Sequence, residues 1–307
     1  MPEGHTVHRI ARLFDSLFTG QVVAASSPQG RFRDGAAAVS GARVLGVEAV
    51  GKQLFILFDN ELVIRVHLGI YGAWDVATLD AGSQRAGAPA AQSLGAPRVT
   101  RRRLDEAERE RSEDIPFPPP PVGQVRLRLE TPGAIADLRG PTACEVLTPE
   151  QATRVKDSLG PDPLVHRGKA AERDFLQRVG STARPIGLVL MDQSVVSGIG
   201  NVYRAEILFR HRLDPFVPAK NLSEDTTLAL WADWRVLLAD GVKTGLMLTR
   251  DDLDAAGRRR AMRSSKERYF VYKRQGLPCR VCSAHVALEM MAARKLYFCP
   301  ACQADAK

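Results

Sequence analysis

Two CxxC pairs near the C-terminus constrain this chain more than any other feature of its sequence. They are Cys279–Cys282 and Cys299–Cys302, separated by sixteen residues. A CxxC turn presents two thiolates to one metal ion, so two such turns complete a tetrahedral zinc site. Four thiolates leave no coordination position for water, which predicts one structural zinc ion rather than a catalytic one. A redox function of the pairs is the alternative, but two pairs in one short basic segment favour metal binding.

The composition is that of a basic globular protein. The 307 residues include 43 Lys and Arg against 35 Asp and Glu, a formal net charge of +8. This charge favours a polyanionic partner, either nucleic acid or an anionic membrane surface. No apolar run is long enough to cross a membrane, and the N-terminus lacks the apolar segment of a signal peptide. We therefore expect a cytoplasmic monomer, associated with the nucleoid if bacterial, that does not enter a membrane.

Residues 1–147 are predicted to form a β-rich domain with a leading helix. Apolar side chains recur at helical spacing from Val7 to Phe18, and Thr19 with Gly20 ends the helix. Runs typical of strands follow, with Asp59 and Asn60 as a hairpin turn. The predicted strands are 43–50, 53–58, 62–68, 124–129 and 134–138. Cys144 is expected to be a buried structural thiol.

The segment from about residue 80 to 121 differs from its surroundings. It is rich in Ala, Gly, Arg and Glu and ends in PFPPPP. Because it offers few large apolar side chains for burial, we expect an exposed and partly disordered insertion. Acidic residues follow Arg101–Arg103, which favours a solvated charged loop over a DNA-contacting patch.

Residues 148–275 are predicted to be helical, and residues 276–307 to form the zinc module. Thr148 and Glu150 suggest a helix-capping arrangement at the start of the helical part. The whole chain is therefore expected to be a multidomain α+β protein. The predicted helices are 173–179, 186–196, 202–209 and 226–242.

The N-terminus offers an amine nucleophile. If the initiator methionine is removed, Pro2 has a free secondary amine that can attack an aldehyde-like carbon and form an iminium ion. Glu3 beside it can donate or accept a proton. The positive end of the following helix dipole disfavours protonation of the amine. The alternative is that the sequence MPE is merely a common start, and His5 and His8 are expected on the helix surface with no role.

Basic and aromatic residues precede the second CxxC pair. Arg294, Lys295 and Tyr297 on a zinc hairpin suit phosphate contact and stacking. His285 lies between the CxxC pairs, and we expect it at the surface because four cysteines already complete the metal shell.

Four motifs, in order, resemble the formamidopyrimidine-DNA glycosylase/endonuclease VIII family. They are MPEGHTVHRIARLF, VGKQLF, DQSVVSGIGNVYRAEILF and ARKLYFCPACQ. The resemblance covers nearly the whole chain except the insertion, and the MPEG start is more similar to the endonuclease VIII branch. It implies an N-terminal β-sandwich, a helix-two-turns-helix domain and a C-terminal zinc finger, with damaged DNA as the partner and the damaged nucleotide flipped out.

The resemblance also implies roles for individual residues. Pro2 resembles the Schiff-base nucleophile, and Glu3 the acid that assists sugar-ring opening and base departure. Lys52 matches the hairpin lysine of β-elimination and phosphate contact. Arg294 matches the zinc-finger arginine tied to phosphate binding and δ-elimination. Asn201 closes SGIGN and matches a phosphate-contacting asparagine, where glycines and free helix N–H groups suit a phosphate.

Three further positions match the family more loosely. Ile70 and Tyr71 are candidates to fill the hole left by the flipped base, with core packing as the alternative. Arg139 resembles the arginine that faces the opposite strand. The implied activity is a bifunctional glycosylase and AP lyase of base excision repair that removes oxidised bases, pyrimidines on the branch resemblance. The rival interpretation is a non-catalytic zinc-finger protein that binds lesions; a generic zinc ribbon would explain only the last thirty or so residues.

Overall fold

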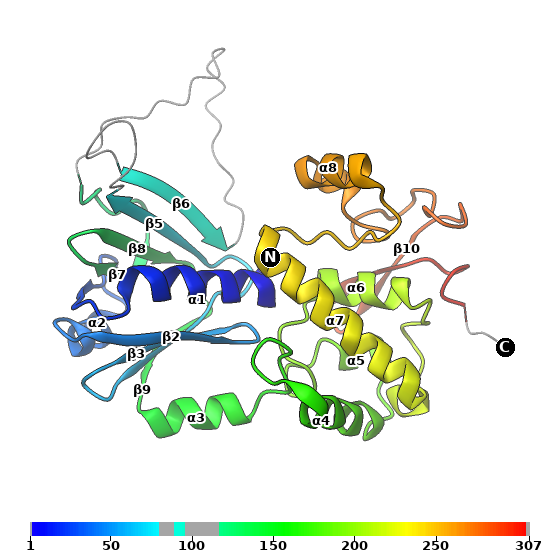
Figure 1. The fold of residues 1–307 in the computed structure, drawn as a ribbon, viewed down its shortest axis with the longest axis horizontal. Helices are drawn as coiled ribbons and strands as arrows, with labels where there is room; N and C mark the ends of the chain where they lie inside the picture. The colour runs from blue at the N-terminus through cyan, green and yellow to red at the C-terminus, as the bar shows by residue number, and fades with distance from the viewer. Residues whose placement is uncertain (1, 80–88, 96–116, 305–307) are drawn as a thin grey trace, which may run out of the picture. The chain divides into compact units, whose positions relative to one another are not determined.

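The computed structural model describes residues 2–79, 89–95 and 117–304. The chain divides into two compact units, one made of residues 1–2 and 6–155 and the other of residues 3–5 and 156–307. Residues 3–5 therefore pack with the second unit, although the chain runs on from them into the first. Figure 1 shows most strands in the first unit and most helices in the second, which also contains β10.

The first unit contains two antiparallel sheets, which confirms the predicted β-sandwich (Figure 1). One sheet has the strand order β1-β7-β8-β5-β6, and the other has the order β2-β3-β4-β9. Asp59 and Asn60 form the predicted turn after β3. The strands are β1 (Ala24–Ser26), β2 (Val44–Val50), β3 (Gln53–Phe58), β4 (Val63–His67), β5 (Ala73–Leu79), β6 (Pro89–Gly95), β7 (Val125–Glu130), β8 (Ala134–Arg139) and β9 (Ala143–Leu147).

Helix α1 (Gly4–Phe18) supplies the centre of this core. Its apolar face is buried in one cluster with side chains from both sheets, so the helix packs against each of them. The ring of Phe14 lies edge-on to Trp74 of β5, with centroids 4.8 Å apart. Gly20 has a φ of 82°, which only glycine adopts readily, and the helix ends before it as predicted.

Two expectations for the first unit need correction. Residues 89–95, predicted to lie in an unstructured insertion, form β6 and pair with β5 from Leu79↔Pro89 to Ala73↔Gly95. The rest of the insertion up to residue 116, including Arg101–Arg103, lies outside the described residues. A seven-residue helix that was not predicted, α2 (Arg33–Val39), precedes β2.

The capping of α3 (Pro149–Asp157) also differs from the prediction. Gln151, not Glu150, completes the reciprocal capping box. Its side chain accepts from the backbone N–H of Thr148 at 2.8 Å, and its own N–H donates to the Thr148 hydroxyl at 3.3 Å. Glu150 instead accepts from that hydroxyl at 2.7 Å.

The second unit is mainly helical, as predicted. Its core is formed by apolar side chains from α4 to α7, among them Phe175, Trp231 and Trp234. Helix α8 was not predicted. The helices are α4 (Gly168–Gly180), α5 (Ile186–Val189), α6 (Asn201–Arg210), η1 (Ala219–Asn221), α7 (Glu224–Thr244), α8 (Ala255–Arg263) and η2 (Ser265–Glu267).

The predicted helix over 186–196 is wrong beyond its first turn, because side chains there bind the backbone and compete with helix formation. The carboxylate of Asp192 accepts from the backbone N–H and the hydroxyl of Ser194, at 3.0 and 2.6 Å. The side chain of Gln193 accepts from the backbone N–H of Gly198 at 3.0 Å. These contacts shape the glycine-rich loop before α6.

The chain ends in the predicted cysteine-bearing module, built on one hairpin. Strands β10 (Ala287–Met291) and β11 (Arg294–Phe298) pair antiparallel. The turn residues Ala292 and Ala293 have φ angles of 47° and 58°, so two left-handed residues connect the strands as in a tight hairpin. No helix within the described residues is long and apolar enough to span a membrane.

Candidate active site and zinc module

Four cysteine thiols converge beside the β10–β11 hairpin. The Sγ atoms of Cys279, Cys282, Cys299 and Cys302 all lie within 4.8 Å of one another. Two of the separations are 3.9 Å, between Cys279 and Cys302, and 3.4 Å, between Cys282 and Cys299. A tetrahedral zinc ion with Zn–S bonds of about 2.3 Å requires sulfur atoms about 3.8 Å apart. The thiols fit one structural zinc ion, as predicted.

The backbone around the cysteines supports a thiolate cluster. The N–H groups of Val281 and Cys302 donate to the sulfurs of Cys279 and Cys299 at 3.5 and 3.4 Å. Such donors stabilise the negative charge that a zinc-bound thiolate carries. Ser283 has a φ of 64°, which lets the first CxxC turn close tightly.

Glu3 lies at the start of helix α6, although the two are far apart in the sequence. Its side chain is fully buried. The carboxylate accepts from the backbone N–H groups of Gly200 at 3.0 Å, Val202 at 2.8 Å and Tyr203 at 3.4 Å. Backbone donors at a helix N-terminus bind an ionised carboxylate, and the helix dipole adds to the attraction.

This contact corrects the expectation that the N–H groups after SGIGN are free for a phosphate, because Glu3 occupies them. The glycines make the contact possible, as predicted for a close backbone approach. A Cβ atom at Gly200 would collide with the Glu3 carboxyl group, and one at Gly4 would lie 2.9 Å from the Cα of Gly198. The backbone N–H of Gly4 also donates to the carbonyl of Gly198 at 2.9 Å.

Asn201 connects α6 to the zinc hairpin. Its amide nitrogen donates to the carbonyl of Lys295 at 2.8 Å, and its oxygen accepts from Arg204. Arg204 also donates to the Lys295 carbonyl at 3.1 Å. Burial and the nearby charge of Arg294 lower the pKa of Arg204 to about 10. The side chain predicted to contact phosphate thus also holds strand β11 against α6.

Two charged residues of α6 were missed by the sequence analysis, and both are fully buried. One is Arg204. The other is Glu206, which accepts from the Thr249 hydroxyl at 2.5 Å and from the backbone N–H groups of Phe270, Val271 and Tyr272, each at 2.8 Å. Burial raises the pKa of Glu206, although these hydrogen bonds oppose the rise. The sequence signal that could have revealed both residues is a charged side chain among the apolar residues of a predicted helix.

The zinc hairpin exposes part of the predicted basic and aromatic cluster. Arg294 and Lys295 are exposed, and His285 is exposed as expected. Tyr297 is only 5 % exposed and packs against Tyr272 with ring centroids 5.2 Å apart, so the expectation that it is available for stacking is wrong. Tyr297 points inward because it belongs to the apolar face that covers the cysteines.

The histidines of α1 are also more buried than predicted. His5 and His8 are 4 % and 8 % exposed, which contradicts the surface positions expected for them. His5 packs edge-on against Tyr203, with ring centroids 5.6 Å apart. The first turn of α1 therefore contacts α6 rather than solvent.

The first unit carries the remaining predicted site residues. Pro2 is buried immediately before α1, and Lys52 is half-buried in the turn between β2 and β3. Burial, and after it the charges of Lys52 and Arg65, lower the pKa of His67. Of the predicted site residues, Glu3, Asn201, Arg294 and the four zinc cysteines belong to the second unit, whereas Pro2, Lys52, Ile70, Tyr71 and Arg139 belong to the first.

The loosely matched residues have distinct environments. Ile70 and Tyr71, in the turn between β4 and β5, are 48 % and 82 % exposed, which excludes the core-packing alternative. Arg139 forms an ion pair with Asp75 and donates to the carbonyl of Val122 at 2.7 Å. Cys144 is partly buried in β9, and burial raises its pKa to about 12, consistent with an inert structural thiol.

Models of known protein families match three consecutive parts of the chain. Residues 1–139 match the formamidopyrimidine-DNA glycosylase N-terminal domain, and residues 159–252 match the formamidopyrimidine-DNA glycosylase H2TH domain. Residues 276–304 match the zinc finger found in FPG and IleRS. These matches follow the β-sandwich, the helical segment and the cysteine module.

Individual relatives agree with the family models. Endonuclease 8 1 of Mycobacterium tuberculosis strain H37Rv is 37% identical over 304 residues, 99% of this chain and 100% of the relative. Formamidopyrimidine-DNA glycosylase of Thermus thermophilus is 37% identical over 147 residues, 48% of this chain and 54% of the relative.

Solved structures share the fold. The MutM (Fpg) protein of Thermus thermophilus superposes with a TM-score of 0.69 at 25% identity, covering 100% of both chains. A complex of Lactococcus lactis Fpg with abasic-site DNA has a TM-score of 0.71 at 19% identity, covering 99% of this chain and 100% of that chain. Together with the full-length relative, these matches show that the chain belongs to the formamidopyrimidine-DNA glycosylase/endonuclease VIII family of base-excision-repair DNA glycosylases with AP lyase activity.

Proposed function

We propose that this protein removes oxidised pyrimidines from DNA and cleaves the strand, with the nitrogen of Pro2 as the nucleophile. The observation that carries the proposal is the fully buried Glu3 carboxylate, which accepts from the backbone N–H groups of Gly200, Val202 and Tyr203 at the start of α6. Glu3 directly follows Pro2 in the chain. A fixed carboxylate next to a secondary amine is an acid–base group suited to amine attack on a sugar. The pyrimidine preference rests on the similarity to the endonuclease VIII relative.

The proposed reaction needs no catalytic metal or redox cofactor. After removal of the initiator methionine, the Pro2 nitrogen bonds to C1′, the glycosidic bond breaks, and the base leaves with that electron pair and takes up a proton. The Pro2 nitrogen gives up its N–H proton, and Glu3 assists transfer of a proton to O4′ as the C1′–O4′ bond opens, which leaves an iminium ion between the nitrogen and C1′. Loss of a C2′ proton then expels the 3′ phosphate, and a second elimination expels the 5′ phosphate. Hydrolysis of the iminium frees Pro2.

Other residues are proposed to position the DNA. Lys52 would contact phosphate and assist β-elimination. Arg294 is exposed on the zinc hairpin and would bind phosphate during δ-elimination. Asn201 would approach phosphate from the start of α6, with its amide already fixed by Lys295.

The residues proposed to set base preference lie in the first unit. Ile70 and Tyr71 are exposed apolar side chains suited to the space left by a flipped nucleotide. Arg139 would face the opposite strand, and its ion pair with Asp75 fixes its direction. We expect the protein to act as a cytoplasmic monomer on damaged DNA.

Borohydride trapping tests the covalent step. An oligonucleotide with an oxidised pyrimidine should give a stable protein–DNA adduct with the wild type and none with Pro2→Gly. Pro28→Gly is a matched control, because Pro28 is an exposed proline of the same unit. Mass spectrometry of the active enzyme should show Pro2 as the first residue.

The rival function, lesion binding without excision, predicts a different outcome. In that case the wild type would bind the damaged duplex tightly, give no adduct and leave the strand intact. Retention of the initiator methionine in protein with full activity would equally exclude Pro2 as the nucleophile.

A further inference from the structure

A strongly basic segment follows the long helix α7, apart from the residues assigned above. Between positions 258 and 268 the chain has six Arg and Lys residues and a single acidic residue, Glu267. The segment comprises most of α8 and the 3-10 turn η2, which follows it directly. Such a density of positive charge is unfavourable unless an anion neutralises it.

Three of these arginines share the exposed side of α8. Gly257 and Ala261 are buried, whereas Arg259, Arg260 and Arg263 are exposed. With 3.6 residues per turn, the three arginines span an arc of about 100° opposite the buried pair. Because α8 packs through the small residues Gly257 and Ala261, its three exposed arginines form one continuous basic face.

Among the described residues, no acidic side chain pairs with the three arginines of this face. Arg258, at its margin, pairs with Asp240 at 2.9 Å. Within the described part of the chain, no ion pair joins Arg259, Arg260 or Arg263 to a carboxylate. Exposed arginines without an ion pair to any of the described residues are available to an external anion.

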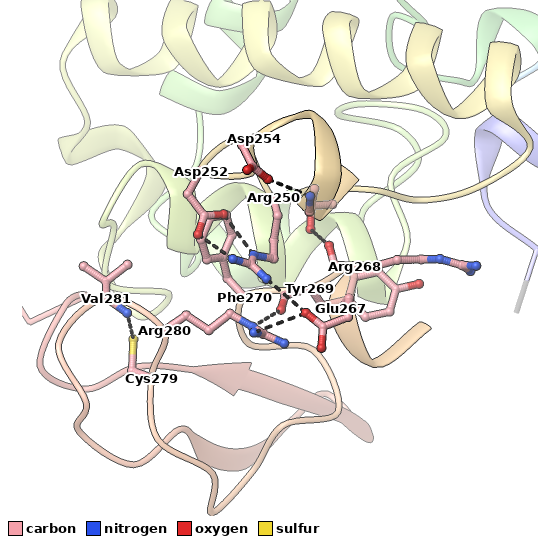
Figure 2. A network of polar contacts seen from close by, with 12 residues as sticks. Arg250, Asp252, Asp254, Glu267, Arg268, Tyr269, Phe270, Cys279, Arg280 and Val281 are labelled. Atoms are coloured by element: carbon pink, nitrogen blue, oxygen red, sulfur yellow. Dashed lines mark hydrogen bonds and ion pairs between the residues drawn. The ribbon is translucent and has the colours of Figure 1, made fainter. Parts of the chain in front are cut away.

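The surrounding contacts hold α8 in a fixed position (Figure 2). Asp254 caps its first turn by accepting from the backbone N–H of Gly257 at 2.6 Å. Arg268 satisfies two carbonyls of the last turn, donating to Ala261 at 2.9 Å and to Met262 at 3.0 Å.

The zinc module contributes to this support. Arg280, between Cys279 and Cys282, donates to the carbonyl of Tyr269 at 3.1 Å (Figure 2). It also donates to the carbonyl of Lys266 at 2.7 Å. The metal-binding turn thus fixes the end of the basic segment, so less conformational freedom of the side chains and backbone is lost when an anion binds.

We propose that Arg259, Arg260 and Arg263, none of which has a role in the reaction proposed above, form a phosphate-binding face for the DNA backbone. This inference rests on DNA being the substrate, as proposed above. Arg259 and Arg263 are separated by a rise of about 6 Å along the helix. Successive phosphates of one strand are about 3.4 Å apart along the duplex axis, so the face can meet two or three of them. Contacts of this kind strengthen binding without reading the base.

The salt dependence of DNA binding tests this face. The triple variant Arg259→Gln, Arg260→Gln, Arg263→Gln should weaken binding and make the slope of log K against log salt shallower by about 2 to 3, since each phosphate contact contributes about 0.9. The loss should be equal for damaged and undamaged duplexes. The control, Arg167→Gln, Arg173→Gln, Arg235→Gln, removes three exposed arginines elsewhere in the same unit and should leave the slope nearly unchanged.

Equal slopes for the wild type and the α8 variant would overturn the proposal, as would the same change in the α8 variant and the control. Borohydride trapping at saturating enzyme separates this result from the catalytic proposal. The α8 variant should still form the covalent adduct because Pro2 is untouched. If wild type and variant differ in salt slope but neither forms an adduct, the catalytic proposal fails and the phosphate-binding face stands.

Discussion

The β-sandwich buries mainly aliphatic and aromatic side chains, whereas the second unit also buries Glu3, Arg204 and Glu206 completely. In the sandwich, apolar side chains need only fill space between two sheets and α1. In the second unit, buried charged groups connect α6 to the N-terminus, to the zinc hairpin and to residues 270–272. An apolar core accepts changes of shape at modest cost, but a buried carboxylate depends on every donor it faces. The second unit should therefore be more sensitive to conservative substitutions.

The largest expected effect comes from loss of the metal. Cys299→Ser, or a strong chelator, should unfold residues 276–304, because zinc binding contributes about 10–16 kcal/mol in small thiolate modules. Limited proteolysis with measurement of bound zinc should show cleavage in the module and an intact sandwich. Cys144→Ser, outside the cluster, is the control and should retain one zinc per chain. A metal-free protein whose module resisted protease would refute the metal's structural role.

Glu206→Gln should be the next most damaging change, although it preserves side-chain shape. Each carboxylate oxygen of Glu206 accepts two hydrogen bonds. A glutamine presents N–H donors where one of these acceptors stood, so two buried donors lose their partner at a cost of about 3 kcal/mol. Urea unfolding of the second unit should show this loss. A change below about 1 kcal/mol would mean that buried charge is not what orders this unit.

Asp233→Asn tests the same idea through pH. The side chains of Asp233 and Arg210 are 10% and 15% exposed, and their N–O distance is 2.8 Å. Burial raises the pKa of Asp233, but the hydrogen bonds from His211 and Arg210 outweigh it and hold the pKa below 3.8. Stability from this carboxylate is therefore complete above about pH 4 and is lost as the pH falls through the folded-state pKa.

The variant should lose about 2 kcal/mol at neutral pH and show a flatter acid limb in the plot of stability against pH. The exposed Asp225 lies on the same helix, so Asp225→Asn is the control. Parallel acid limbs for the wild type and Asp233→Asn would contradict the expectation.

Phe14→Leu measures the tolerance of the sandwich. Phe14 is fully buried against Trp74, yet leucine keeps the site apolar and loses only part of the volume. We expect a cost of about 1 to 1.5 kcal/mol, well below that of Glu206→Gln. Thermal unfolding of Phe14→Leu and Glu206→Gln compares the two losses of stability directly. A larger loss for Phe14→Leu would contradict the expected difference between the two units.

Tyr71→Ser should have the smallest effect on folding. The side chain is 82 % exposed, so the change in stability should stay within about 0.5 kcal/mol. Excision of the lesion should nevertheless fall if Tyr71 fills the space left by the flipped nucleotide. Leu45→Ser, at a 58 % exposed position of the same unit, is the control and should change neither the stability nor the rate of excision.

The sequence analysis anticipated those features that depend on local pattern. Strands β2, β3, β4, β7 and β8 and helices α1, α4, α6 and α7 follow the spacing of their apolar residues, and the CxxC spacing indicated the zinc site. Strands β1, β5, β6 and β9 were not predicted. Helix α8 was missed because its arginines leave little apolar periodicity. The contacts of Glu3 and Glu206, and the burial of His5, join residues that are distant in the sequence. Their partners are mostly backbone N–H groups, which no side-chain pattern reveals.

The contact between Glu3 and Gly200 also has a consequence for biosynthesis. The two residues are 197 positions apart, so a ribosome adding about 5–20 residues per second needs roughly 10–40 s to make the second after the first. Throughout that interval the start of α6 has not been synthesised, and the Glu3 carboxylate lacks the backbone N–H groups that bind it in the folded protein. The N-terminal residue Glu3 is thus synthesised early but reaches its folded position late. The hydrogen bonds that fix Glu3, the residue next to Pro2, therefore form only after the start of α6 has been synthesised.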